Sequence, residues 1–223
     1  NVPISDETFV RRIYLDLAGR IPTAAETRAF LDSKQPDKRA ALISDLLARE
    51  SYVSHFYNFW ADILRLKSHF VNTANVVPAA YAKWIKESLR ANKPYDQFLI
   101  EQIAGDQVAT PADPSAYAAM GFLTLGRRFL NNPHDIIDDR IDVVTRGLMG
   151  LTVTCARCHD HKYDPIPTRD YYSLYGVFRS STEPLVLPLF KTPTDHPEYR
   201  RFTAELSVRQ QNLDDFVAQK HAA

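Results

Sequence analysis

The chain has 223 residues, of which 45% are hydrophobic and 11% aromatic, enough for a folded core and too many for a disordered chain. Its 27 basic and 27 acidic residues cancel, so no net charge favours binding to nucleic acid or to an anionic membrane. No apolar run reaches the length of about 18 residues that a membrane-spanning helix needs.

Hydrophobic residues recur with helical spacing along most of the chain, and no segment alternates for long enough to predict a sheet. The first helix should begin behind Ser5 and end before Gly19. Thr23 followed by Glu26 has the pattern of a capping box, which predicts a second helix. Further helices are predicted from Pro36 to Leu47 and over residues 56–64, 78–92, 95–103, 136–153, 168–178 and 202–217. The expected fold is therefore all-α, an irregular multi-helix domain with a C-terminal helical extension.

The longest ordered segment is expected between Ile136 and Val153, where apolar residues repeat every three or four positions. Gly147 and Gly150 either allow close packing within this helix or end it. A continuous helix would place Met149 on the same side of a bound group as the residues that follow the helix, and we expect this side chain in the core.

We predict three parts along the chain. Residues 1–180 form the helical domain, residues 181–197 form a Pro-rich linker, and residues 198–223 form a C-terminal helix that belongs to a larger protein. The chain begins with Asn1 rather than Met, so we expect it to be a processed or excised part of that protein.

Both cysteines of the chain lie in one short motif, Cys155-Ala156-Arg157-Cys158-His159. This is the C-x-x-C-H pattern of c-type haem attachment. Two thiols about one helical turn apart can add to the two vinyl groups of one porphyrin, and the following histidine then supplies the proximal iron ligand. The motif predicts a covalent haem c held by Cys155 and Cys158, with His159 on the iron.

Three other interpretations of the motif are open at this point. The thiols can be ordinary core residues beside an ordinary histidine. They can bind Zn²⁺ with His159 or His161, although a distant side chain must then complete the site, because the sequence lacks a second pair of ligands. A redox dithiol of the thioredoxin type needs a βαβ context that the sequence lacks.

Residues 140–166, with the core Cys-Ala-Arg-Cys-His-Asp-His-Lys-Tyr-Asp-Pro-Ile, resemble the signature of the planctomycete-type cytochrome c-like domains. The resemblance is to the second such domain, long described as a domain of unknown function. Further matches lie in residues 9–22, 93–106, 121–123 and 170–172, so the resemblance covers roughly residues 5–180. It implies a haem-bearing electron-transfer module within a large exported protein of planctomycetes or related bacteria.

One position departs from this family. Its members commonly carry a histidine before the tryptophan of their second helical segment, whereas Phe59 precedes Trp60 in this chain. This position cannot supply a distal haem ligand here.

A low-spin electron-transfer haem needs a second axial ligand, usually Met or His. His134, in the loop before the long helix, is the first candidate, followed by His69 and Met120. His161 is two residues from the proximal ligand, so we expect it to bond a propionate, a carboxylate or a different metal. An iron without a sixth ligand would favour peroxide or gas chemistry instead.

Charged residues cluster around the motif. Four aspartates form one acidic helix face: Asp135, Asp138, Asp139 and Asp142. We expect this face to be solvated, or to pair with nearby cations, namely Arg140, Arg146, Arg157 and Lys162. Together with Asp160 and Asp164 it could instead hold Ca²⁺.

Residues next to the haem ligands are further candidates for the cofactor site. Arg157 and Lys162 could neutralise the haem propionates, and Tyr163 could contact the ring. The second nitrogen of His159 needs an acceptor, usually a backbone carbonyl, and the run Pro165–Pro167 could supply it.

Covalent haem implies assembly outside the cytoplasm, so we expect a periplasmic or otherwise exported protein. Its partner would be a redox protein or an adjacent domain of the same polypeptide, with no nucleic acid and no membrane span in this segment. The alternative from another class is a structural or interaction module, with zinc or without a metal. The sequence shows no pattern of a hydrolase.

Overall fold

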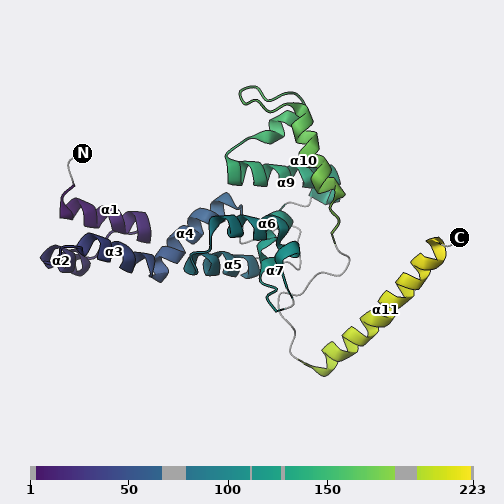
Figure 1. The fold of residues 1–223 in the computed structure, drawn as a ribbon, viewed down its shortest axis with the longest axis horizontal. Helices are drawn as coiled ribbons and strands as arrows, with labels where there is room; N and C mark the ends of the chain where they lie inside the picture. Colours follow the sequence, from purple (N-terminus) through teal and green to yellow (C-terminus); the bar gives the residue numbers. More distant parts are fainter. Residues whose placement is uncertain (1–3, 67–78, 111, 127–128, 184–194, 222–223) are drawn as a thin grey trace. The chain divides into compact units, whose positions relative to one another are not determined.

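The computed structural model describes residues 4–66, 79–110, 112–126, 129–183 and 195–221. Within these ranges every regular element is a helix and none is a strand, which confirms the all-α prediction. The chain divides into two units, Asn1–Pro188 and Leu189–Ala223 (Figure 1). The predicted loop 68–77, with His69, lies outside the described residues, as do residues 184–194 of the predicted linker.

The first unit begins with four helices: α1 (Asp6–Ala18), α2 (Ala24–Asp32), α3 (Lys38–Leu47) and α4 (Glu50–Ile63). Helix α1 begins and ends where the sequence predicts, because Ser5 accepts a hydrogen bond from the amide of Thr8 and Gly19 adopts a left-handed conformation. Helices α1–α3 share a small core of five buried side chains, Val10, Tyr14, Ala18, Phe30 and Leu46. Helix α4 continues from this core to the next one.

The capping box of α2 also anchors a cluster of charges. Thr23 and Glu26 cap the helix reciprocally, as predicted. The Glu26 carboxylate lies 2.7 Å from a guanidinium nitrogen of Arg20 and 3.3 Å from one of Arg49. The hydrogen bonds from Arg20, and then that from the Thr23 amide, hold the pKa of Glu26 well below its usual range.

This low pKa predicts an acid-dependent loss of stability. A carboxylate with a lowered folded pKa stabilises the protein fully above its unfolded pKa of about 4.3, and the contribution declines as the pH falls below that value. We expect Glu26→Gln to lower the unfolding free energy by about 1 kcal/mol at pH 7, and by less at pH 3. Urea unfolding of both proteins at the two pH values measures this. An equal difference at both would contradict the assignment.

The middle of the first unit is its largest core. It contains α5 (Ala79–Arg90), α6 (Tyr95–Val108), α7 (Ala116–Ala119) and α8 (Gly121–Thr124). Trp84, Ile85 and Phe98 are among its buried side chains. The sequence predicts that the helix from residue 95 ends by Gly105, but α6 is only kinked at Ala104 and continues to Val108.

The last core of the first unit carries the cysteine motif. Helix α9 (Pro133–Val144) and α10 (Thr168–Ser180) pack against a short 3-10 helix, η3 (Val153–Arg157). Their shared core contains Ile137, Ile141, Val153, Ala156 and Tyr171. The motif is therefore built on a packed helical framework and not on a free loop.

Residues 136–153 do not form one continuous helix, and of the two roles predicted for the glycines, ending the helix is the one that Gly150 takes. Helix α9 passes into a single π-helical turn, η2 (Thr145–Met149), and ends at Gly150, which adopts a left-handed conformation with φ of 70°. The amide of Leu151 returns to the carbonyl of Thr145, so the chain changes direction before η3. Met149 is consequently 61% exposed and not in the core as predicted.

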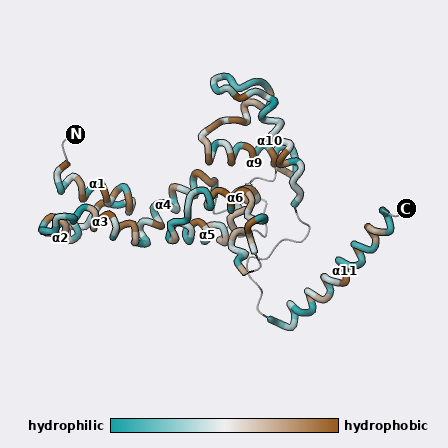
Figure 2. Tube along the Cα trace, viewed as in Figure 1, coloured by the Kyte–Doolittle hydropathy of each residue, from teal (hydrophilic) through white to brown (hydrophobic). Residues whose placement is uncertain are grey.

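The second unit contains α11 (Pro197–His221), which at 25 residues replaces the segment 136–153 as the longest described helix. None of its residues is buried, and hydrophilic and hydrophobic residues are interspersed along it (Figure 2). Within the part of the chain that is described, no helix combines the length and the apolar character needed to cross a bilayer.

Candidate cofactor site

The motif places Cys155 within η3 and Cys158 at its C-terminal end, and both cysteines are exposed. In a 3-10 helix residues three apart lie above one another. Val153 and Ala156 form the face that is buried in the core, whereas Cys155 and Cys158 are both free and exposed. The core side of the helix thus fixes the backbone while both sulfur atoms stay accessible.

His159 follows directly, is also exposed, and has its ring orientation set by its neighbour. The Nδ1 atom lies 2.8 Å from the carbonyl oxygen of Asp160. A carbonyl only accepts, so Nδ1 carries the proton and donates it. The Nε2 atom then has a lone pair, and it has no hydrogen-bond partner among the described residues. This is the arrangement of a histidine that is prepared to bind a metal through Nε2.

The acceptor for His159 is not the one that the sequence suggests. The run Pro165–Pro167 does not supply it, because Nδ1 of His159 donates to Asp160 instead. The Ile166 carbonyl in this run accepts from the backbone amide of His161, at 2.9 Å. Asp160 supplies the acceptor through its own carbonyl. Its carboxylate at the same time accepts from the amide of Thr168, at 2.8 Å, and so caps the start of α10.

His161 lies inside the loop that follows the motif, and only 6% of its side chain is exposed. Its Nδ1 is 2.9 Å from the amide nitrogen of Asp164 and 3.3 Å from that of Tyr163. Its Nε2 is 3.0 Å from the hydroxyl of Thr152. Both ring nitrogens are therefore engaged within the protein, and a role for His161 as a metal ligand would require these bonds to break.

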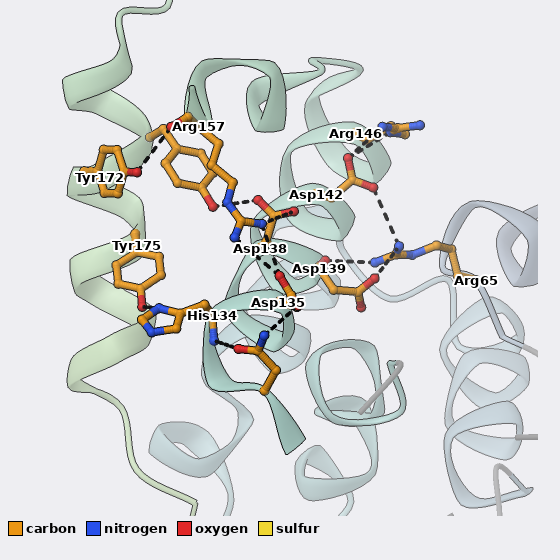
Figure 3. A network of polar contacts seen from close by, with 12 residues as sticks. Arg65, His134, Asp135, Asp138, Asp139, Asp142, Arg146, Arg157, Tyr172 and Tyr175 are labelled. Atoms are coloured by element: carbon orange, nitrogen blue, oxygen red, sulfur yellow. Dashed lines mark hydrogen bonds and ion pairs between the residues drawn. The ribbon is translucent and has the colours of Figure 1, made fainter. Parts of the chain in front are cut away.

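The other residues proposed to contact a cofactor differ in their surroundings. Arg157 is directed toward α9, where a guanidinium nitrogen lies 3.3 Å from Asp135 and 3.5 Å from Asp138 (Figure 3). Lys162 is exposed and lies over the ring of Tyr163, 5.1 Å from its centroid, and Tyr163 itself is 82% exposed. Lys162 and Tyr163 thus remain accessible to a ligand, whereas Arg157 is already paired.

The acidic face of α9 is paired with arginines rather than simply solvated. Arg65, at the end of α4, lies 3.0 Å from Asp139 and 3.6 Å from Asp142, and Arg146 lies 2.8 Å from Asp142 (Figure 3). A pocket of about 380 Å³ opens along this face, lined by Phe129, Asp135, Asp138, Asp139, Asp142, Arg146 and Thr154. Of the predicted cations, Arg140 contacts the Leu123 carbonyl and Glu183 instead.

The predicted Ca²⁺ and Zn²⁺ ligands are not gathered into a metal site. Asp160 caps α10, and Asp164 lies against His161. In the described ranges no group of three or more His, Cys, Asp or Glu side chains has an arrangement that could hold a metal ion.

The candidates for a distal haem ligand lie in different places. The ring of His134 stacks on Tyr175 of α10, with centroids 5.9 Å apart, and its Nδ1 is hydrogen-bonded to the tyrosine hydroxyl (Figure 3). Met120 lies between α7 and α8 and packs close to Gly105 of α6, in the middle core. The third candidate, His69, lies outside the described residues.

The structure adds four residues to the site that the sequence analysis did not identify: Thr152, Asp160 as a carbonyl acceptor, Arg65 and Tyr175. A signal existed for Tyr175, because it lies three and four positions after Tyr172 and Tyr171 and so shares a helix surface with them. Tyr172 bonds the Arg157 carbonyl of the motif, and Tyr171 bonds Asp138 of α9. No local pattern points to Arg65, since its carboxylate partner is 74 residues away.

One comparison with known protein families gives a match, and the match includes the region that carries the motif. A family model named PSCyt2, with the description "Protein of unknown function (DUF1549)", matches residues 1–183. The name suggests a cytochrome-like domain, and the description assigns no activity. Neither a curated protein nor a solved structure shows significant similarity to the chain.

Proposed function

Because the chain belongs to the PSCyt2 family of unknown function, we propose that its first unit is a c-type cytochrome module that holds one covalent haem and transfers electrons. The observation that carries this proposal is the arrangement on η3. Two free cysteines are exposed, and they are followed by a histidine whose Nδ1 is tied to a carbonyl and whose Nε2 has a lone pair.

The residues present fit this group. Cys155 and Cys158 would hold the porphyrin through thioether bonds, and His159 would ligate the iron through Nε2. When bound, haem supplies one-electron chemistry at the iron. The hydrogen bond from His159 to Asp160 keeps the ring in the required tautomer and makes the imidazole a stronger ligand. Lys162, exposed and unpaired with any carboxylate in the described contacts, is the better placed of the two predicted propionate partners.

In this proposal the protein works outside the cytoplasm, where covalent haem is attached. Its electron donor or acceptor is a redox protein or an adjacent domain of the same polypeptide. The structural alternative, with zinc or without a metal, needs no haem at all.

A second candidate function is an open five-coordinate haem that binds peroxide or a diatomic gas. The position of one distal candidate favours it. Met120 is packed against Gly105 in a different core. His134 uses only its Nδ1 in the bond to Tyr175. An iron that keeps only His159 as an axial protein ligand would have room for an exogenous ligand.

Absorption spectra test these proposals. We expect the protein, when exported through a host with haem-maturation machinery, to show a c-type spectrum that changes reversibly between the oxidised and the dithionite-reduced form. Low-spin bands would support electron transfer, and high-spin bands that shift with added cyanide would support the open iron. The same protein made without the maturation machinery is the control. A colourless product from both hosts, with zinc at one ion per chain, would establish the structural alternative.

A further inference from the structure

The loop after the motif is held by backbone hydrogen bonds and by three hydrogen bonds to the ring of His161. His161 donates its backbone amide to the carbonyl of Ile166, at 2.9 Å, and the amide of Ile166 returns to the carbonyl of Asp164, at 2.7 Å. The ring of His161 fills the space within this turn, where its Nδ1 lies within 3.3 Å of two backbone amide nitrogens, those of Tyr163 and Asp164. The His161 side chain therefore stabilises the conformation of this loop.

These contacts fix the protonation of the ring. An amide N–H only donates, so Nδ1 must accept and cannot carry a proton. The proton of the neutral imidazole is then on Nε2, which donates to the Thr152 hydroxyl at 3.0 Å. The Asp164 carboxylate, 3.3 Å from Nδ1, does not change this assignment, because Nδ1 already receives two amide hydrogens.

The hydrogen bond between His161 and Thr152 reaches the start of η3, because Thr152 is the residue directly before this helix. The hydrogen bond from His161 to Thr152 joins the chain before the motif to the chain after it. The segment that it closes contains Cys155, Cys158 and His159. We call this closure the Thr152–His161 clamp.

We propose, on the basis of the haem function proposed above, that His161 is a positioning residue for the proximal ligand His159. Asp160 lies between the two histidines and provides both the acceptor for His159 and the cap of α10. The clamp holds His161 on one side of Asp160, and α10 holds the other side through Thr168. Asp160 therefore keeps its carbonyl directed at His159, and the ring is oriented before any iron binds.

Substitutions of His161 and Thr152 can separate the contacts made by the two ring nitrogens of His161. His161→Asn keeps an acceptor close to the position of Nδ1 but cannot reach Thr152. His161→Gln keeps a donor near Nε2 but loses the acceptor for the two loop amides. His161→Ala loses both. Thr152→Val removes the partner of Nε2 alone and leaves the histidine in place.

The first measurement uses the full chain without haem, so it does not depend on the proposed function. In ¹⁵N-labelled protein at a pH where the histidines are neutral, we expect His159 as the Nδ1–H tautomer and His161 as the Nε2–H tautomer. In His161→Ala, the amides of Tyr163 and Asp164 should exchange about tenfold faster or more, and His159 should lose its preference for Nδ1–H. His161→Asn and Thr152→Val should both retain slow exchange of these amides, but each breaks the clamp, so both should weaken the preference of His159 for Nδ1–H.

The second measurement uses haem-loaded protein. We expect His161→Ala to broaden the NMR signals of the axial histidine and to shift the midpoint potential. His161→Asn and Thr152→Val, which also break the clamp, should do the same to a smaller extent. An unchanged His159 tautomer in His161→Ala would overturn the inference even if haem binds normally. Protein that never takes up haem but shows the expected tautomers would overturn the proposed function and keep the role of His161 in orienting His159.

Discussion

A chain in which Cys155 and Cys158 are both replaced by serine is expected to carry no covalent haem and to keep its helical fold. Both cysteines are exposed, and the packing of η3 depends on Val153 and Ala156 instead. Exposed substitutions of this kind usually change the free energy of unfolding by less than about 0.5 kcal/mol. The double substitution should therefore abolish covalent haem attachment while changing the stability of the fold very little.

The measurement is the amount of haem that stays bound to the chain after denaturation. It is compared between the wild type and the double variant. The single variants Cys155→Ser and Cys158→Ser provide the control, since each retains one thioether position. Circular dichroism and thermal melting check the fold. Equal amounts of haem in the wild type and in the double variant would show that the thiols do not attach it. A double variant that fails to fold would contradict the placement of both thiols outside the core.

Replacing Gly105 by alanine is expected to have the largest effect on stability. Gly105 is buried at the kink of α6, and an added Cβ would lie 2.4 Å from the backbone carbonyl oxygen of Ala116 and 3.0 Å from the side chain of Met120. The carbonyl belongs to α7 and cannot move aside without separating the two helices. We expect a loss of about 1–3 kcal/mol in the free energy of unfolding.

Gly176→Ala is the matched control, because an added Cβ at this position of α10 meets no atom within 4 Å. Alanine is a better helix former than glycine by about 1 kcal/mol in an exposed helix interior, so this variant should be slightly more stable than the wild type. Thermal and urea unfolding of the two variants should thus move in opposite directions. If both become more stable, α6 and α7 do not approach each other as closely as described.

Much of the helical fold could be predicted because its signals are local. Ser5, Gly19 and the pair Thr23–Glu26 mark helix ends through hydrogen bonds within a few residues. The break in the helix at 136–153 has a local cause as well. Apolar spacing continues past Gly150, but the left-handed conformation of this glycine turns the chain, and periodicity does not reveal a backbone conformation.

The site could be predicted as a set of residues but not as an arrangement. The C-x-x-C-H spacing identifies the two thiols and His159, whereas the acceptor for His159 depends on which way one peptide group points. The pairing of Arg65 with Asp139 joins residues 74 positions apart. Such contacts follow from how the helices pack, and a single sequence carries no direct signal of them.

Covalent haem on the cysteine motif is the central claim, and the mass of the peptide that contains it tests the claim most directly. The protein should be exported through a host with haem-maturation machinery, digested, and its haem content measured as the pyridine haemochrome. We expect the peptide with Cys155 and Cys158 to carry the added mass of one haem, at one haem per chain. The unmodified peptide with two free thiols, in a protein without haem, would contradict the claim.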